Sequence, residues 1–139
     1  MAAFRIRERF FHIEFFRTAE NEFLPLEVNL RPPGGFTTDM FNYAADVDIY
    51  RAWAEVVVNG ATTLDYHPSY HCCYASRKSH LRYRHSEDAV RSRFPEAVVK
   101  IDHVPGVFRS ALGDVGFIVR TRDLDTLLEI VRTIHETEP

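Results

Sequence analysis

Hydrophobic and polar residues alternate along two stretches near the start of the chain, which predicts two strands of an antiparallel hairpin. In the first stretch, one face is expected to carry Phe11, Ile13 and Phe15, and the other His12, Glu14 and Phe16. In the second stretch, one face is expected to carry Leu24, Leu26, Val28 and Leu30, and the other Glu27, Asn29 and Arg31. The linker, residues 18–22, is rich in turn-forming residues and has an ordinary hairpin-loop length.

The register of this hairpin decides whether the polar side chains of the two strands meet, because a slip of one residue moves a strand's pattern to the other face. If Thr18 pairs with Phe23 across a four-residue loop, Glu14 lies directly opposite Glu27. Two carboxylates that face each other repel and destabilise a sheet. This register therefore calls for a positive group between the two side chains.

The residues beside the two carboxylates suggest what that positive group is. The amide oxygen of Asn29 adds a third hard ligand, and such a set suits Mg²⁺ or Mn²⁺. Arg31 adds a planar fork of donors that fits a phosphate or a carboxylate. The alternative is that these polar residues form the solvated face of an ordinary antiparallel hairpin.

The rest of the chain predicts a mixture of helices and strands, and hence an α+β fold. Helices are expected from Asp39 to about Ala45, from Val47 or Asp48 to Asn59, from Ser86 to Phe94 and from Leu124 onward, and strands over residues 66–76, 97–104 and 116–120. Trp53 is expected in the core on the helical face formed by Ile49, Trp53, Val56 and Val57. The last helix is expected to bury the stripe Leu124, Leu127, Leu128, Val131 and Ile134.

Composition narrows the class of protein. The 139 residues, 45% of them hydrophobic, are enough for a domain with its own core. The formal net charge of -3 argues against a nucleic-acid partner, although Arg77, Lys78, Arg82 and Arg84 form a basic group that we expect to be a solvated strand end. No apolar run reaches membrane-spanning length, and no signal peptide is recognisable. A cytoplasmic location and no membrane partner are therefore expected.

Histidine and cysteine residues gather in the middle of the sequence, at His67, His71, Cys72, Cys73, His80 and His85. A zinc protein is one hypothesis for them. The spacing argues against it, because neighbouring residues of a strand point to opposite faces and no pair is separated by two residues. The adjacent Cys72 and Cys73 do not form a disulfide framework, and they suit a reducing compartment.

Glu14, thirteen residues before the run Glu27-Val28-Asn29-Leu30-Arg31, resembles the last part of the ATP-grasp fold. The longer strings Phe11-His12-Ile13-Glu14-Phe15-Phe16 and Glu27 to Gly35 are similar to the carboxylate-amine ligase and biotin-carboxylase-like branch. The resemblance is strongest from about Phe10 to Val58. It implies that Glu14, Glu27 and Asn29 hold Mg²⁺ against the phosphates of ATP, and that Arg31 contacts the phosphate or the substrate carboxylate.

The same resemblance implies an organisation in two parts, with residues 1–62 as the C-terminal part of an ATP-grasp subdomain and residues 63–139 as a small α+β domain. The groups that hold adenine lie upstream of the acidic strands in this family, and only nine residues, expected to form one or two helical turns, precede Phe10. The chain is therefore expected to be a C-terminal piece of a ligase that activates a small carboxylate through an acyl phosphate, inactive alone. The alternative is a non-catalytic assembly module that docks on an N-terminal ATP-grasp half or forms a homo-oligomer.

Overall fold

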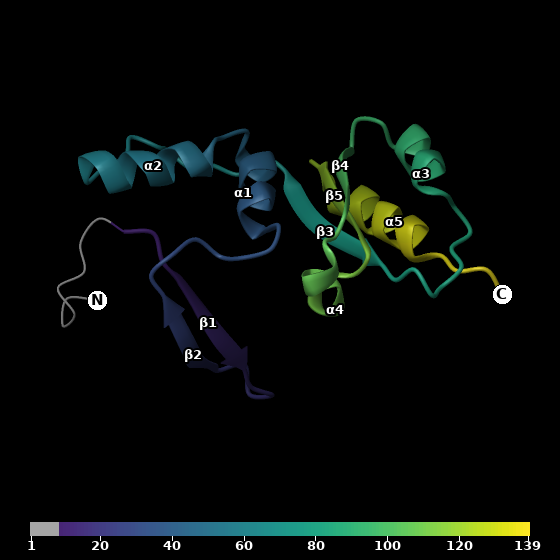
Figure 1. Ribbon diagram of the computed structural model, residues 1–139, viewed down its shortest axis with the longest axis horizontal. Helices are drawn as coiled ribbons and strands as arrows, with labels where there is room; N and C mark the ends of the chain where they lie inside the picture. Colours follow the sequence, from purple (N-terminus) through teal and green to yellow (C-terminus); the bar gives the residue numbers. More distant parts are fainter. Residues whose placement is uncertain (1–8) are drawn as a thin grey trace. The chain divides into compact units, whose positions relative to one another are not determined.

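The computed structural model describes residues 9–139, and it divides the chain into two compact units (Figure 1). The first unit runs to Thr38 and resumes over Asp48–Asp65, whereas the second contains Asp39–Val47 and Tyr66–Pro139. The predicted α+β class is confirmed, since both helices and antiparallel sheets are present. Within residues 9–139, every helix is too short or too polar to cross a bilayer. The helical turns predicted before Phe10 lie outside the described residues, apart from Arg9.

From residue 9 onward, the first unit contains a two-stranded antiparallel sheet and one complete helix (Figure 1). Its elements are β1 (His12–Arg17), β2 (Phe23–Asn29) and α2 (Ile49–Asn59). Helix α2 begins at Asp48, whose side chain accepts a hydrogen bond from the amide of Arg51, and ends at Gly60, which has a φ of 75°. These two ends agree with the bounds that the sequence predicts.

The predicted core position of Trp53 is wrong, because 41% of this residue is exposed. On α2 only Ile49 and Ala52 are buried. Because only these two residues are buried along three turns, the helix contacts the rest of the protein through a narrow strip. Ala52, rather than the larger Trp53, lies in that strip. Tyr50, Trp53, Val57 and Val58 of α2 are exposed.

The second unit is built on a three-stranded antiparallel sheet with the order β3-β5-β4 (Figure 1). Its strands are β3 (His71–Arg77), β4 (Val98–His103) and β5 (Val115–Thr121). The remaining elements are α1 (Thr37–Ala45), which begins in the first unit, and α3 (Glu87–Arg93), η2 (Gly106–Phe108), α4 (Arg109–Leu112) and α5 (Leu124–His135). Strand β3 begins five residues later than predicted, after Pro68, whose ring removes a backbone donor.

The core of the second unit lies between the sheet and α5, which packs against β3 and β5 (Figure 1). Its fully buried members include Phe117, Val119, Ile130 and Ile134. The predicted stripe on α5 is partly wrong, because Leu124 and Leu128 are 49% and 41% exposed and Ile130 is buried instead. The buried positions 127, 130 and 134 keep the i, i+3, i+7 spacing, and because 127 and 134 belong to the predicted stripe, the buried face is only rotated slightly from it.

Arg77 corrects the prediction that the basic group is a solvated strand end, because this residue is only 5% exposed. Its Nε donates to the carbonyl of Ile134 at 2.7 Å, and its Nη1 donates to the carbonyl of His85 at the same distance. The guanidinium also lies over the rings of Tyr83 and Phe117. Arg77 therefore ties the end of α5 to β3 and to the loop before α3, which is a structural role.

Candidate functional site

Glu14 of β1 and Glu27 of β2 are direct cross-strand partners, as predicted. The predicted path to this register is wrong, however, because Arg17 rather than Thr18 pairs with Phe23 at the turn. A bulge in the ladder between Glu14 and Phe15 then shifts the pairing by one residue.

The bulge lies where β2 contains Pro25, which has no amide hydrogen to donate to a ladder. It also rearranges the faces of the sheet. Leu24 pairs with Phe16, which is two residues from Glu14, so Leu24 lies on the carboxylate face. The prediction that Leu24 shares the face of Val28 is wrong for this reason. The carboxylate face therefore ends in two apolar residues near the turn.

His12 lies beside the two carboxylates, although it was not among the ligand residues predicted from the sequence. One donor atom from each of His12, Glu14 and Glu27 can be chosen so that all three lie within 4.8 Å of one another. His12 Nε2 lies 3.5 Å from Glu14 Oε1. The signal was present in the sequence, since the alternation places His12 two residues before Glu14 on the same face.

The imidazole of His12 is held by a hydrogen bond of 3.1 Å between its Nδ1 and the backbone carbonyl of Arg31. Because a carbonyl oxygen only accepts, Nδ1 carries the proton in this bond, and in the neutral ring Nε2 presents a lone pair. Nε2 lies 3.1 Å from Nδ2 of Asn29, which donates to it. The side chain of His12 is 15% exposed, compared with 51% for Glu14. The ring is thus less exposed than either of the two carboxylates.

Asn29 bridges the two strands at this face. Its Nδ2 donates to Glu27 Oε1 at 2.6 Å in addition to its contact with His12. The amide group therefore donates to two of the three residues of the cluster, His12 and Glu27. The structure brings Asn29 to Glu27, with its amide nitrogen rather than the predicted oxygen directed at the carboxylate.

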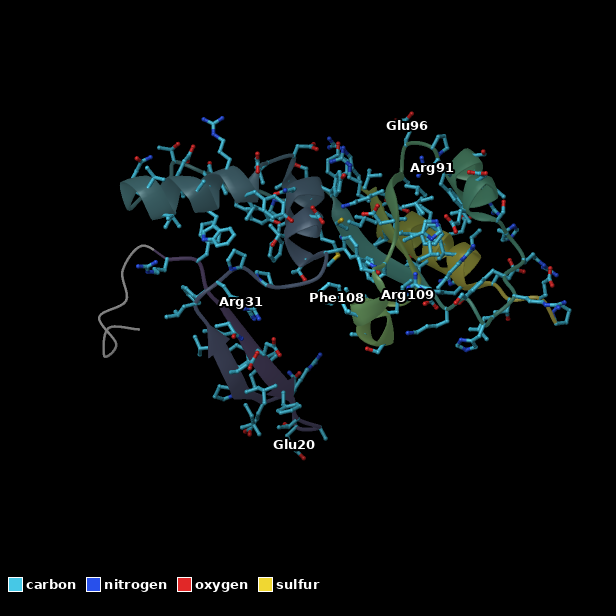
Figure 2. All side chains as sticks on the ribbon, in the orientation of Figure 1. Glu20, Arg31, Arg91, Glu96, Phe108 and Arg109 are labelled. Carbon is cyan, nitrogen blue, oxygen red and sulfur yellow. The ribbon has the colours of Figure 1, made fainter. Side chains whose placement is uncertain are left out.

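Arg31, the predicted anion contact, lies beyond the end of β2, at the opposite end of the hairpin from Glu20 in the turn (Figure 2). Its Nη1 donates to the carbonyl of Pro32 at 3.1 Å, and the residue is exposed. Its backbone carbonyl is the group that orients His12. Arg31 is thus attached to the carboxylate cluster through its main chain, and its guanidinium remains accessible to an anion from solvent.

The cysteines of β3 offer no comparable site. Burial, and secondarily the neighbouring Cys73, raises the pKa of the Cys72 thiol to about 11. Burial also raises the pKa of Cys73. Both thiols stay protonated at neutral pH, and the protonated form is a poor nucleophile and metal ligand.

A hollow of about 470 Å³ lies elsewhere in the first unit, between the residues before β1 and the end of α2. It is lined by Arg9, Phe10, Phe11, Val56, Gly60, Ala61 and Thr62. This lining is mostly apolar and brings together no pair of acid and base groups. The carboxylate face of the hairpin is therefore the stronger candidate site.

Comparisons with known proteins add no further assignment to this geometry. No family model matches the chain, and no curated protein matches it.

Proposed function

We propose that this chain is the C-terminal portion of an ATP-grasp ligase and supplies the Mg²⁺-phosphate site of its ATP. The observation that supports this proposal most directly is the pairing of Glu14 with Glu27 across β1 and β2. Facing carboxylates destabilise an antiparallel pair, so this arrangement is costly unless a cation offsets the repulsion.

The residues present fit a divalent ion. Two carboxylates supply hard oxygen ligands, and the side-chain oxygen of Asn29 is within reach after rotation of its amide. An ion bound here would neutralise charge on the phosphates of the nucleotide, and the guanidinium of Arg31 would donate to a phosphate or carboxylate oxygen. Glu14, Glu27 and Asn29 would thus hold the ion, while Arg31 would orient the anionic reactant.

By the ATP-grasp resemblance, the complete enzyme transfers the γ-phosphoryl group of ATP to a small carboxylate and releases ADP. An amine or another nucleophile then attacks the acyl phosphate and displaces phosphate. We propose a cytoplasmic location for this reaction, where ATP is supplied and where Cys72 and Cys73 remain reduced. This chain alone is not expected to turn over.

The test is a calorimetric titration of the 139-residue chain with Mg-ADP, with and without EDTA. We expect heat that disappears on chelation, and a loss of affinity on the order of 10- to 100-fold in Glu27→Gln. Glu20→Gln, in the exposed turn of the same hairpin, is the matched control and should bind as the wild type does. Equal binding by wild type and Glu27→Gln would contradict the metal assignment.

A second candidate function is that of a non-catalytic assembly module, and the exposed apolar side chains of the hairpin favour it. Phe15, Phe23 and Val28, on the face of the hairpin away from the carboxylates, are all at least half exposed. Contiguous exposed apolar surface of this kind is typical of an interaction site. Self-association that rises with concentration in sedimentation velocity, and is unchanged by Mg-ADP, would support this function over the first.

A further inference from the structure

We infer that His12 is a third protein ligand of the hairpin ion and that it gives the site a preference for Mn²⁺ over Mg²⁺. This inference rests on the proposed function, since it concerns the same ion. It adds a ligand that the ATP-grasp resemblance does not assign, and it names the chemical class of ion that the site takes.

The first argument is the position of the ring nitrogen. The closest ligand atoms of His12, Glu14 and Glu27 all lie within 4.8 Å. Ligands that bind one octahedral ion at about 2.1 Å lie about 3.0 Å apart when adjacent and about 4.2 Å apart when opposite. Side-chain rotations that move the ligand atoms by about 1–2 Å therefore bring all three onto a common ion, without a change in the strand register.

The second argument is the orientation of the imidazole. A histidine that binds a metal through one ring nitrogen almost always donates its other N–H to a carbonyl or carboxylate, which fixes the tautomer. His12 has this arrangement, because Nδ1 lies 3.1 Å from the Arg31 carbonyl and Nε2 is directed toward the carboxylates. The carbonyl belongs to a residue outside the ligand cluster, so the ring is oriented by the backbone that follows β2.

The third argument is the position of the Asn29 amide, which donates hydrogen bonds to two of the three ligand residues. Nδ2 of Asn29 lies 2.6 Å from Glu27 Oε1 and 3.1 Å from His12 Nε2. One electropositive N–H₂ group thus bridges a carboxylate and an imidazole lone pair, which are the two groups that a cation would bridge. Rotation of the amide would replace its nitrogen by its oxygen, and Asn29 would change from a donor to these ligands into a ligand itself.

The choice of ion follows from the ligand types. Mg²⁺ prefers oxygen ligands and near-ideal octahedral geometry, whereas imidazole suits Zn²⁺, Cu²⁺, Fe²⁺ and Ni²⁺, and Mn²⁺ lies between these two classes. Mn²⁺ accepts carboxylates as readily as Mg²⁺ does and tolerates a nitrogen ligand better. A site with one imidazole and two carboxylates should therefore bind Mn²⁺ more tightly than Mg²⁺.

The experiment titrates the full chain with Mn²⁺, read by the loss of the EPR signal of the free ion, and then with Mg²⁺ as competitor. We expect wild type to bind Mn²⁺ at least about tenfold more tightly than Mg²⁺. His12→Gln should lower Mn²⁺ affinity on the order of 10- to 100-fold and Mg²⁺ affinity by much less, so that the preference is lost. The control is His80→Gln, an exposed histidine of the second unit, which should leave both affinities unchanged.

Failure of this inference is distinguishable from failure of the proposed function. If His12→Gln keeps the wild-type preference while Glu27→Gln loses both ions, His12 is not a ligand, but the carboxylate site stands. If Glu27→Gln binds both ions as wild type does, the proposed function is wrong and this inference falls with it.

A spectroscopic measurement avoids dependence on any variant. Electron spin echo envelope modulation of Mn²⁺ bound to the wild-type chain should show coupling to a directly bound ¹⁴N nucleus of an imidazole. Bound Mn²⁺ without that coupling would overturn the assignment of His12.

Discussion

The two antiparallel sheets of this protein are made of similar residues and differ in what covers them. Phe117 of β5 is completely buried, whereas Phe15 of β1 is 50% exposed. The core of the second unit includes residues of α5, which packs against β3 and β5, while both strands of the hairpin are exposed along most of their length. The unit with the larger core therefore provides stability, and the less covered hairpin provides the candidate chemistry, as is common for functional segments.

The largest expected effect tests this contrast with one phenylalanine from each sheet. Phe117→Ala should lower the free energy of unfolding by about 3–5 kcal/mol, because it leaves a cavity in the core. Phe15→Ala should change it by no more than about 0.5 kcal/mol, since its side chain is half exposed. Urea denaturation followed by far-UV circular dichroism measures both values. Similar losses in the two variants would mean that the hairpin is covered as well as the sheet is.

Much of the fold follows from short-range signals in the sequence. The ends of α2 are set by Asp48 and Gly60, and α3 begins at Ser86, each a side chain or glycine that satisfies helix-end groups locally. Burial is less predictable, because it depends on which face meets another element. Periodicity identifies α5 as amphipathic, but it does not distinguish Ile130, which is buried, from Leu128, which is exposed.

The candidate site was also predictable only in part, because some of its features follow from local patterns and others from contacts between distant residues. Alternation predicts that Glu14 and Glu27 lie on polar faces of their strands. Their direct pairing, however, depends on the actual turn register and on the bulge beside Pro25, and neither can be derived from a period of two. His12 lies on the predicted polar face, yet its role depends on a contact with the Arg31 carbonyl, which forms only because the chain turns after β2. That contact is tertiary, and no local pattern encodes it.

A second prediction concerns the close packing of the covered sheet. A Cβ atom added at Gly116 would clash with the hydroxyl oxygen of Tyr74, which donates to the carbonyl of Leu112. Gly116→Ala should therefore cost about 1–3 kcal/mol, since the half-buried tyrosine must move. Gly106→Ala is the matched control, because nothing lies within 4 Å of the added atom there. Thermal denaturation compares them, and equal melting temperatures would contradict the tight packing of β5.

A third, smaller effect concerns the start of α5, on the exposed side of the same unit. Hydrogen bonds from the side chain and the amide of Thr126 lower the pKa of Asp123. Because the folded pKa lies below the unfolded one, this stabilisation is present above about pH 4 and is lost as the pH falls through the folded pKa. Asp123→Asn keeps a capping oxygen without the charge, so its difference from wild type should vanish in acid.

The measurement for this third prediction is the melting temperature of both proteins between pH 7 and pH 2. Asp123→Ala, which removes the capping oxygen, should remain less stable than Asp123→Asn throughout. A difference between wild type and Asp123→Asn that persists unchanged at the lowest pH would show that the charge of Asp123 is not the cause.

The smallest expected effect is a change in the stability of the hairpin whose sign depends on whether the ion is bound. In the presence of EDTA, Glu27→Gln should stabilise the hairpin by about 0.2–1 kcal/mol, because it removes the repulsion from Glu14 while its amide oxygen still accepts from Asn29. With saturating Mn²⁺ the order should reverse, since only wild type gains the free energy of ion binding. Amide hydrogen exchange along β1 and β2 measures both states, with the amides of β5 as the internal reference. In a binding site, the mutual repulsion of the two carboxylates is replaced by attraction to a common cation, so the stability difference between wild type and Glu27→Gln must change when the ion binds. A difference of the same sign and size with and without the ion would show that the facing carboxylates are an ordinary solvated pair.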